Sequence, residues 1–352
     1  MKHLKVMLLP IALAAVSMTA MAQSGVKIGG RIDLGLINSP DDLTKGTSKQ
    51  TKLNESSNGR LNISGVEEIS ADLSAFFMLE MRIDADTGKQ TDADYMFKDK
   101  AWVGLASKQF GEVKLGRVHS PQYGVSTAGR YEAFSGDSYA NNGTRGALAA
   151  NQWNNSIYYT SPTFNGFNVG VIWQSNEKYV TASNANPSAR ASGQGFHVQY
   201  ANGPLSTAFS YQKEQDKQVT TGGDSMGTAA FGAYYDFGVA TLMTTYARSN
   251  DVNIQNTGKE TVFTIGARVP MGPGQFRTSY KKVNDTNLAK INDASADKDS
   301  TRFSVGYHYP LSKQTSINLS LVREKQERYN ADGSTKSNFS GTGYEVALRK
   351  MF

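Results

Sequence analysis

The sequence contains no cysteine, and this absence excludes a disulfide framework and any metal site built from thiolates. Charged residues are also scarce, at 19% of the 352 positions. The 37 basic side chains outnumber the 31 acidic ones, but they are scattered singly, whereas a nucleic-acid interface needs them clustered. A nucleic-acid partner is therefore not expected.

Long apolar runs are missing everywhere except near the first residues. Two lysines precede an apolar run at residues 6–16, and Ala20-Met21-Ala22 follows it as a small-residue cleavage site. This run is too short for a membrane-spanning helix, and the cleavage site after it is typical of a secretory signal peptide. We therefore expect residues 1–22 to be a signal peptide. Residues 23–352 would be the exported domain, in which no segment is apolar enough for a transmembrane helix.

Alternating apolar and polar residues recur throughout the exported part. In residues 79–84, for example, Leu, Met and Ile alternate with Glu, Arg and Asp. A period of two is that of a β-strand with one apolar and one polar face. Several segments have about ten residues, the length that a tilted strand needs to cross a bilayer. The pattern predicts sixteen strands, at residues 25–38, 57–67, 71–84, 98–107, 111–118, 154–160, 166–175, 193–201, 204–214, 225–236, 239–250, 259–269, 274–283, 299–309, 315–325 and 341–352.

The connections between these segments alternate between short turns and long polar loops. Outer-membrane barrels are built in this way, with short periplasmic turns and longer external loops. A soluble β-sandwich also alternates, but its apolar face looks inward. The number of strands, the single-domain length and a polar face rich in Gly, Ser, Asn and Arg favour the barrel. We predict an all-β fold, a 16-stranded antiparallel transmembrane β-barrel.

The last predicted strand, GTGYEVALRKMF, ends on Phe352. In a closed barrel the last strand must pair with the first, because an unpaired edge would lie in hydrocarbon. A terminal aromatic residue would then lie in the girdle of aromatic side chains at the membrane interface.

The sequence resembles a known family, the general porins of Gram-negative outer membranes, especially their beta-proteobacterial branch. The resemblance is carried by GRLNISGVEEISADLSAFFMLE (59–80), FKDKAWVGLASKQFGEVKLGR (97–117), NNSIYYTSPTFNGFNVG (154–170), NGPL (202–205), YDFGVA (235–240) and RKMF (349–352). It implies a homotrimer in the outer membrane, in contact with its lipid, and a third external loop folded into the lumen. It also implies that the barrel insertion machinery recognises Phe352 as an assembly signal.

The longest segment without a strand pattern is 119–153, and a loop of this length is normally functional or disordered. It carries Arg130, Glu132, Asp137 and Arg145 among many small residues. Given the resemblance, we expect it to be the constriction loop, and a surface loop is the alternative.

The polar phase of the predicted strands puts ten basic and five acidic side chains in the lumen. Rings of Arg or Lys in a pore favour anions. The basic set is Lys27, Arg31, Arg60, Arg82, Lys114, Arg268, Arg277, Lys281, Arg302 and Arg349, and the acidic set is Asp33, Glu80, Asp84, Glu112 and Glu345.

Arg60 and Glu80 match constriction charges of anion-selective porins. The sequence departs from many such relatives at Asp99, which Lys100 follows, and at Gln152, where the relatives have Arg. The resemblance therefore implies only a modest anion preference. We expect the constriction to include Arg31, Arg60, Glu80, Arg82, Asp99, Lys100, Arg130 and Arg145.

These features predict a water-filled channel for passive diffusion of small hydrophilic solutes and ions, with no cofactor and no metal. The alternative is a substrate-biased channel with a binding site for a particular anion or organic acid. An enzyme is not expected, because no strand bears a nucleophile motif.

Overall fold

The computed structural model of the chain describes residues 25–39, 51–127, 130–136, 138–142, 149–175, 192–216, 224–250, 259–286, 297–329 and 335–352. The expected signal peptide, Asp137 and Arg145 lie outside these residues. Among the residues described, no helix is long and apolar enough to cross a membrane.

Sixteen long strands form the wall within the described residues, and each overlaps one predicted segment. Their ends differ from the predicted ones mostly by one to three residues, and the last strand begins six residues earlier than predicted. The strands are β1 (Gly25–Asn38), β3 (Gly59–Glu68), β4 (Leu73–Asp84), β6 (Lys100–Ser107), β7 (Gly111–His119), β8 (Gln152–Thr160), β9 (Phe167–Gln174), β10 (Ser192–Asn202), β11 (Leu205–Asp216), β12 (Asp224–Asp236), β13 (Thr241–Asn250), β14 (Lys259–Met271), β15 (Gly274–Thr286), β16 (Asp297–Pro310), β17 (Thr315–Tyr329) and β18 (Thr335–Met351).

Three short elements were not predicted. β2 (Thr51–Glu55) adds to the far end of β1, and β5 (Lys89–Gln90) forms a short hairpin on the end of β4. A single turn of π-helix, η1 (Gln122–Thr127), follows β7. All three lie in connections whose polar sequences carry no sustained period, so alternation could not reveal them.

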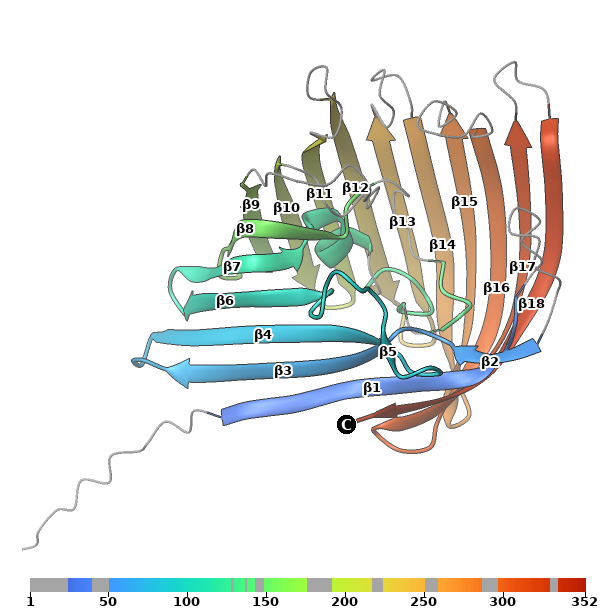
Figure 1. The fold of residues 1–352 in the computed structure, drawn as a ribbon, viewed down its shortest axis with the longest axis horizontal. Coiled ribbons are helices and arrows are strands. Elements are labelled where there is room, and N and C mark those ends of the chain that lie inside the picture. The colour runs from blue at the N-terminus through green and yellow to red at the C-terminus, as the bar shows by residue number, and fades with distance from the viewer. Residues whose placement is uncertain are drawn as a thin grey trace, which may run out of the picture.

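The sheet closes on itself. Every long strand pairs antiparallel with its neighbours in the chain, and β1 also pairs with β18, from Arg31 opposite Met351 to Asn38 opposite Tyr344. In Figure 1, β1, β3, β4, β6 and β7 run nearly crosswise to β13–β17 on the other side, as tilted strands on opposite walls of a barrel must. The predicted 16-stranded antiparallel barrel is confirmed.

The chain terminus completes the closure. The backbone N–H of Gly30 donates to the Phe352 carbonyl at 3.0 Å, and the Phe352 N–H donates to the Gly30 carbonyl at 3.1 Å. A Cβ atom on Gly30 would lie 2.8 Å from the Phe352 ring, so the ring lies directly over this glycine. Phe352 is therefore part of the ladder between the last strand and the first.

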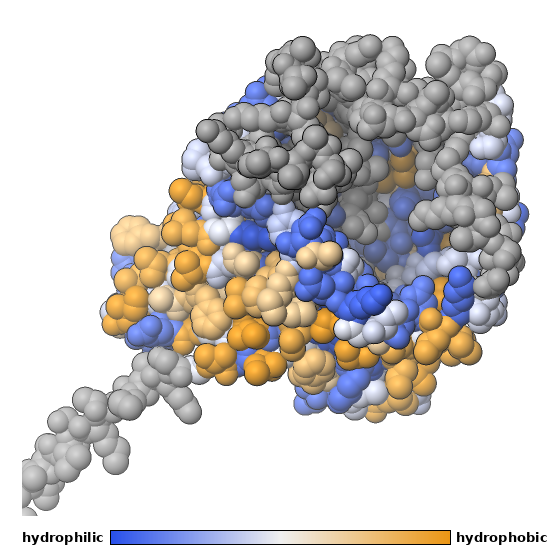
Figure 2. All heavy atoms as spheres, viewed as in Figure 1, coloured by the Kyte–Doolittle hydropathy of each residue, from blue (hydrophilic) through white to orange (hydrophobic). Residues whose placement is uncertain are grey.

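The two faces of the wall differ as the alternation predicted. On β18, Tyr344, Val346 and Leu348 are 39–54% exposed, whereas Glu345 and Ala347 are almost fully buried. The other strands repeat this pattern, with apolar side chains outward and mostly polar ones inward. Figure 2 shows orange, hydrophobic side chains gathered over the outside of the lower wall, and blue and white residues around the hollow beside the grey atoms. The apolar side of the sheet therefore faces outward, which is the reverse of a soluble sandwich.

Candidate functional site: an arginine row inside the barrel

Three arginines lie side by side on the inner wall. The register places Arg31 of β1 opposite Arg60 of β3, and Arg60 opposite Arg82 of β4. Like charges directly opposite one another in a sheet repel, so this row persists only if nearby groups compensate. We call these three residues the arginine row.

Two carboxylates supply the compensation. The Glu80 carboxylate accepts from Arg60 Nη1 at 3.1 Å and from Lys100 Nζ at 2.9 Å. The Asp99 carboxylate accepts from Arg82 Nη2 at 2.7 Å and lies 3.6 Å from Arg60 Nη1. The site as a whole holds four cations and two carboxylates, which leaves an excess of two positive charges.

Neutral groups from the neighbouring loops hold the guanidinium groups in place. Arg82 Nη1 donates to the Asn58 side-chain oxygen at 2.8 Å, and Arg31 Nε donates to the Asn58 backbone carbonyl at 3.2 Å. Arg82 Nη2 also donates to the Tyr123 hydroxyl at 3.2 Å, and Tyr123 belongs to η1. The row is thus fixed by backbone, amide and phenol contacts as well as by charge.

The charges of opposite sign differ in their access to the lumen. The side chains of Glu80 and Asp99 are 3% and 0% exposed, whereas those of Arg60 and Lys100 are 25% and 24% exposed. The acids therefore lie against the wall, and the cations face the water. A passing ion meets positive charge first, and field lines are focused further by the low-dielectric wall.

Asp99 and Gln152, the two residues that depart from the pattern of anion-selective porins, are hydrogen-bonded to each other. Gln152 Nε2 donates to Asp99 Oδ1 at 2.7 Å, and His119 Nε2 lies 3.3 Å from the same oxygen. Burial by itself disfavours ionisation of Asp99, but the interactions with the His119 and Glu80 side chains and the charge of Arg82 outweigh it, so the pKa of Asp99 is held well below its usual range. The carboxylate thus stays ionised and tied to Arg82.

The described parts of residues 119–153 contact the inner wall at several distant strands. The Gln122 N–H donates to the Gln212 side chain of β11 at 3.0 Å, and Asn142 Nδ2 donates to the Ser279 and Ser304 hydroxyls of β15 and β16, each at 3.1 Å. The Tyr139 N–H donates to Glu345 of β18 at 3.0 Å. These contacts hold the segment against residues that point into the barrel.

Carboxylates and one arginine supply further anchors for this segment. Glu214 of β11 accepts from the Ala150 N–H at 3.1 Å and from Trp153 Nε1 at 2.7 Å. Arg268 of β14 donates from Nε to the Ala133 carbonyl at 2.8 Å. Within the segment, the fully buried Glu132 accepts from the Phe134 N–H at 2.7 Å, and its burial raises its pKa.

The structure brings together six of the residues predicted from the sequence: Arg31, Arg60, Glu80, Arg82, Asp99 and Lys100. Arg130 is exposed on the loop, and no ion pair joins it to the row among the residues described. Arg145 lies outside those residues. Asn58 and Tyr123 could not be predicted, because neutral loop residues carry no periodic signal that would assign them to the site. His119 is the last residue of β7, one residue beyond the predicted end of that strand at 118.

A second feature that alternation missed is an apolar interruption of the inner wall. Phe76 and Met78 fall in the polar phase of β4, and the register places Met78 opposite Trp102 and Phe76 opposite Gly104 of β6. All three side chains are partly exposed. The signal was present in the sequence as a break in the alternation, since residues 75–79 read Ala-Phe-Phe-Met-Leu without a polar residue.

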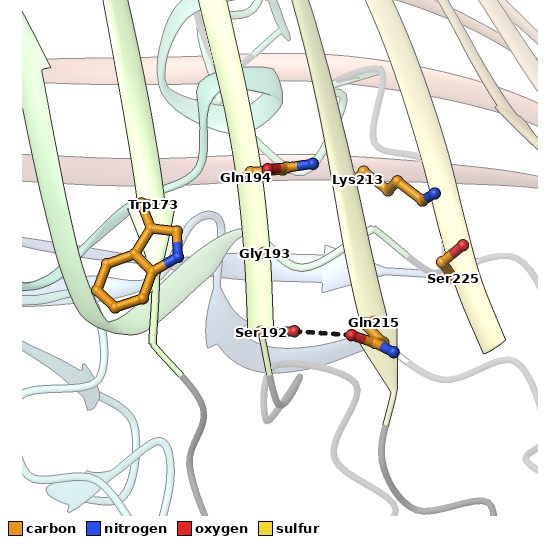
Figure 3. Close-up of a pocket in the computed structure, with 7 residues that line it drawn as sticks. All are labelled: Trp173, Ser192, Gly193, Gln194, Lys213, Gln215 and Ser225. Atoms are coloured by element: carbon orange, nitrogen blue, oxygen red, sulfur yellow. Dashed lines mark hydrogen bonds between the residues drawn. The ribbon is translucent and has the colours of Figure 1, made fainter. Parts of the chain in front are cut away.

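Within the described ranges, no group of three or more His, Cys, Asp or Glu side chains is arranged to hold a metal ion. A pocket of about 390 Å³ lies on the outer face, away from the row. Figure 3 shows Trp173 of β9, Gln194 of β10, Lys213 of β11 and Ser225 of β12 around it. Its side chains alternate with the buried inner ones, so this pocket belongs to the outside of the barrel.

The sequence profile of a family described as Gram-negative porin matches residues 11–329. Outer membrane porin protein 32 of Delftia acidovorans is 29% identical over 381 aligned residues, covering 99% of this chain and all of the relative. An outer membrane porin protein of Bordetella pertussis is 26% identical, covering 89% of this chain and 92% of the relative.

Solved structures have the same fold. An anion-selective porin from Comamonas acidovorans superimposes with a TM-score of 0.75 at 23% identity, covering 94% of this chain and 100% of that one. The trimer form of OmpT from Vibrio cholerae gives a TM-score of 0.66 at 14% identity, covering 94% and 99%. At these identities the similarity concerns the fold of the barrel.

Proposed function

Since the chain belongs to the Gram-negative porin family, we propose that it carries small hydrophilic solutes and ions by passive diffusion with a modest preference for anions. The protein is a multi-pass channel of the outer membrane, and it is not an enzyme. The proposal concerns the sign of its selectivity and the residues that set it.

One observation carries the proposal: in the site around the arginine row, two of the cations are partly exposed, whereas both acids are buried. The 24–25% exposed side chains of Arg60 and Lys100 line the path of an ion, whereas Glu80 and Asp99 lie behind them. A guanidinium stays charged at every relevant pH, so this lining is permanently positive. The preference is modest because the two carboxylates offset half of the four positive charges.

The 119–153 segment acts in this proposal as the constriction loop. Its bonds to inward-facing residues of β11, β15, β16 and β18 support this role. Narrowing the passage brings ions closer to the arginine row, which strengthens the field that each ion meets. Arg130 and Arg145 would add positive charge from the loop itself.

We also infer how the chain is exported and assembled. Residues 1–22 direct export and are removed, and residues 23–352 form the barrel. The barrels associate as a homotrimer in contact with outer-membrane lipid, as the trimer form of OmpT suggests by analogy. The barrel insertion machinery recognises Phe352 as its assembly signal. The backbone hydrogen bonds between Phe352 and Gly30 give this residue a second role, in closing the barrel.

Reversal potentials measured across planar bilayers under a potassium chloride gradient test the selectivity. We expect a reversal potential with the sign of a chloride-selective channel. A reversal potential with the sign of a potassium-selective channel would refute the anion preference. A solute panel separates a simple diffusion channel from a substrate-biased channel, because conductance that saturates at low concentration marks a binding site and linear conductance marks a simple pore.

A further inference from the structure

The inner wall changes character next to the arginine row. Along β4 the inward-facing residues run from Arg82 through Glu80 to Met78 and Phe76, and along β6 they run from Lys100 to Trp102. We call Phe76, Met78 and Trp102 the aromatic patch. It lies on the side of the row nearer the short turn between β3 and β4.

The patch has a defined geometry. The Phe76 and Trp102 rings meet edge to face, with centroids 5.1 Å apart and planes at 74°. Lys114 of β7 places Nζ 5.3 Å from the Trp102 centroid and 5.9 Å from the Phe76 centroid. A Cβ atom on Gly104 would lie 3.0 Å from the Phe76 ring, so the ring lies next to this glycine.

One residue of the patch also borders a buried core. Trp102 packs against a cluster that includes the buried side chains of Val118, Tyr158 and Ile172. Phe76, Met78 and Trp102 remain partly exposed on the polar side of the wall. Contiguous apolar side chains exposed to water commonly mark a binding surface.

We propose that the aromatic patch and the adjacent cations form a subsite for aromatic carboxylates, with benzoate as the simplest member. The carboxylate of the ligand pairs with Lys100 and Arg60, and its ring packs against Trp102 and Met78. Lys100 and Trp102 are two residues apart on the same face of β6, about 7 Å along the strand, which suits a carboxylate attached directly to a ring. This inference rests on the proposed anion-preferring channel.

The charges around the patch select for such an anion. The Lys114 side chain lies over the two rings and is 25% exposed, and it pairs at 2.5 Å with Glu112, whose side chain is 34% exposed. This pair is neutral overall. Lys100 and Arg60 therefore provide the stronger anion contact, and the rings provide the discrimination between carboxylates.

The test uses the full-length mature protein in planar bilayers, with sodium benzoate, cyclohexanecarboxylate and acetate as probes. In the unmutated channel, benzoate conductance is expected to saturate at a lower concentration than acetate conductance, with cyclohexanecarboxylate between them. Trp102→Leu should raise the half-saturating benzoate concentration about two- to tenfold, the size expected for losing one aromatic contact, and leave acetate unchanged.

Trp173→Leu is the matched control, because Trp173 lies on the outer face and is 54% exposed. Benzoate half-saturation should not change in this variant. Equal half-saturation for benzoate and acetate in the unmutated channel would overturn the inference, as would equal effects of the two tryptophan substitutions. Reversal potentials in potassium chloride report the anion preference separately, so a failure of the subsite and a failure of the anion preference can be told apart.

Discussion

Replacing Arg60 by alanine removes one of the four cations around the arginine row without stripping the acids of their partners. Glu80 keeps Lys100 at 2.9 Å, and Asp99 keeps Arg82 at 2.7 Å. The side chain of Arg60 is 25% exposed and lies at the edge of the lumen, so its loss leaves no buried cavity. The barrel should fold, and the excess positive charge at the site should fall from two to one.

The size of the effect follows from the field of one charge. At about 7 Å in water, one unit charge changes the energy of a monovalent ion by about 0.6 kcal/mol before screening. With a Debye length of about 10 Å at 0.1 M salt, about 0.3 kcal/mol remains. An anion loses this stabilisation and a cation is relieved of the same repulsion, so the anion-to-cation permeability ratio should fall about threefold. At 1 M, where the Debye length is about 3 Å, the change shrinks to about 1.2-fold.

Reversal potentials at both salt concentrations measure this ratio. The matched control is Arg323→Ala, which removes the same charge from an exposed side chain that shares the outward phase of β17 with Leu319 and Leu321. It should leave the ratio unchanged. An unchanged ratio for Arg60→Ala at 0.1 M, or an equal fall at both concentrations, would refute the electrostatic reasoning. Arg60→Glu should move the selectivity further towards cations.

Three further outcomes are expected. Asp99→Asn should raise the anion preference at 0.1 M by less than the change expected for Arg60→Ala, because the Asp99 side chain is fully buried and lies farther from a passing ion. It should also destabilise the barrel by about 3 kcal/mol because Arg82 loses a buried partner, and a lower anion preference would contradict the charge balance. Deletion of Phe352 should sharply lower the amount of barrel in the outer membrane while export continues, measured by cell fractionation, and normal amounts would disprove its role. Burial raises the pKa of Glu132 above the usual carboxyl value of 4.5. Protonated Glu132 therefore contributes to the stability of the folded barrel below pH 4.5, and this contribution is lost as the pH rises through the raised pKa. Glu132→Gln should therefore raise the unfolding temperature of the barrel at pH 7, measured as the temperature at which the band of the folded protein disappears from a gel. The difference in unfolding temperature between the variant and the unmutated protein should be smaller at pH 4.

The strands could be predicted because the residues of each strand alternate between apolar and polar. A strand with one face in hydrocarbon and one in water must alternate, and the period survives whatever its neighbours are. This is why all sixteen long strands were found, and why β2, β5 and η1, which lack a sustained period, were not. The inward phase also assigned Arg31, Arg60, Glu80 and Arg82 to the lumen side of their strands.

The pairing inside the lumen could not be obtained in this way. Alternation says that Arg60 faces inward, but it does not say that Arg31 and Arg82 are its neighbours, because that depends on the register of three strands. Nor does it predict that Asp99 is fully buried against Arg82 and Gln152, three residues that belong to separate parts of the chain. Exposure decides how closely a passing ion can approach a charge, and exposure is a property of the assembled wall and loops.

The sequence by itself thus determined the class of the fold, the inward and outward faces of its strands and the closure at Phe352, because these follow from local periodicity and from hydrogen bonds that hydrocarbon leaves no other way to satisfy. Only the tertiary structure decided which charges lie in the open and which are buried, and that Phe76, Met78 and Trp102 meet beside the arginine row. The physical reason is that register and loop packing join residues far apart in sequence, and the energy of a charge or a ring depends on what surrounds it.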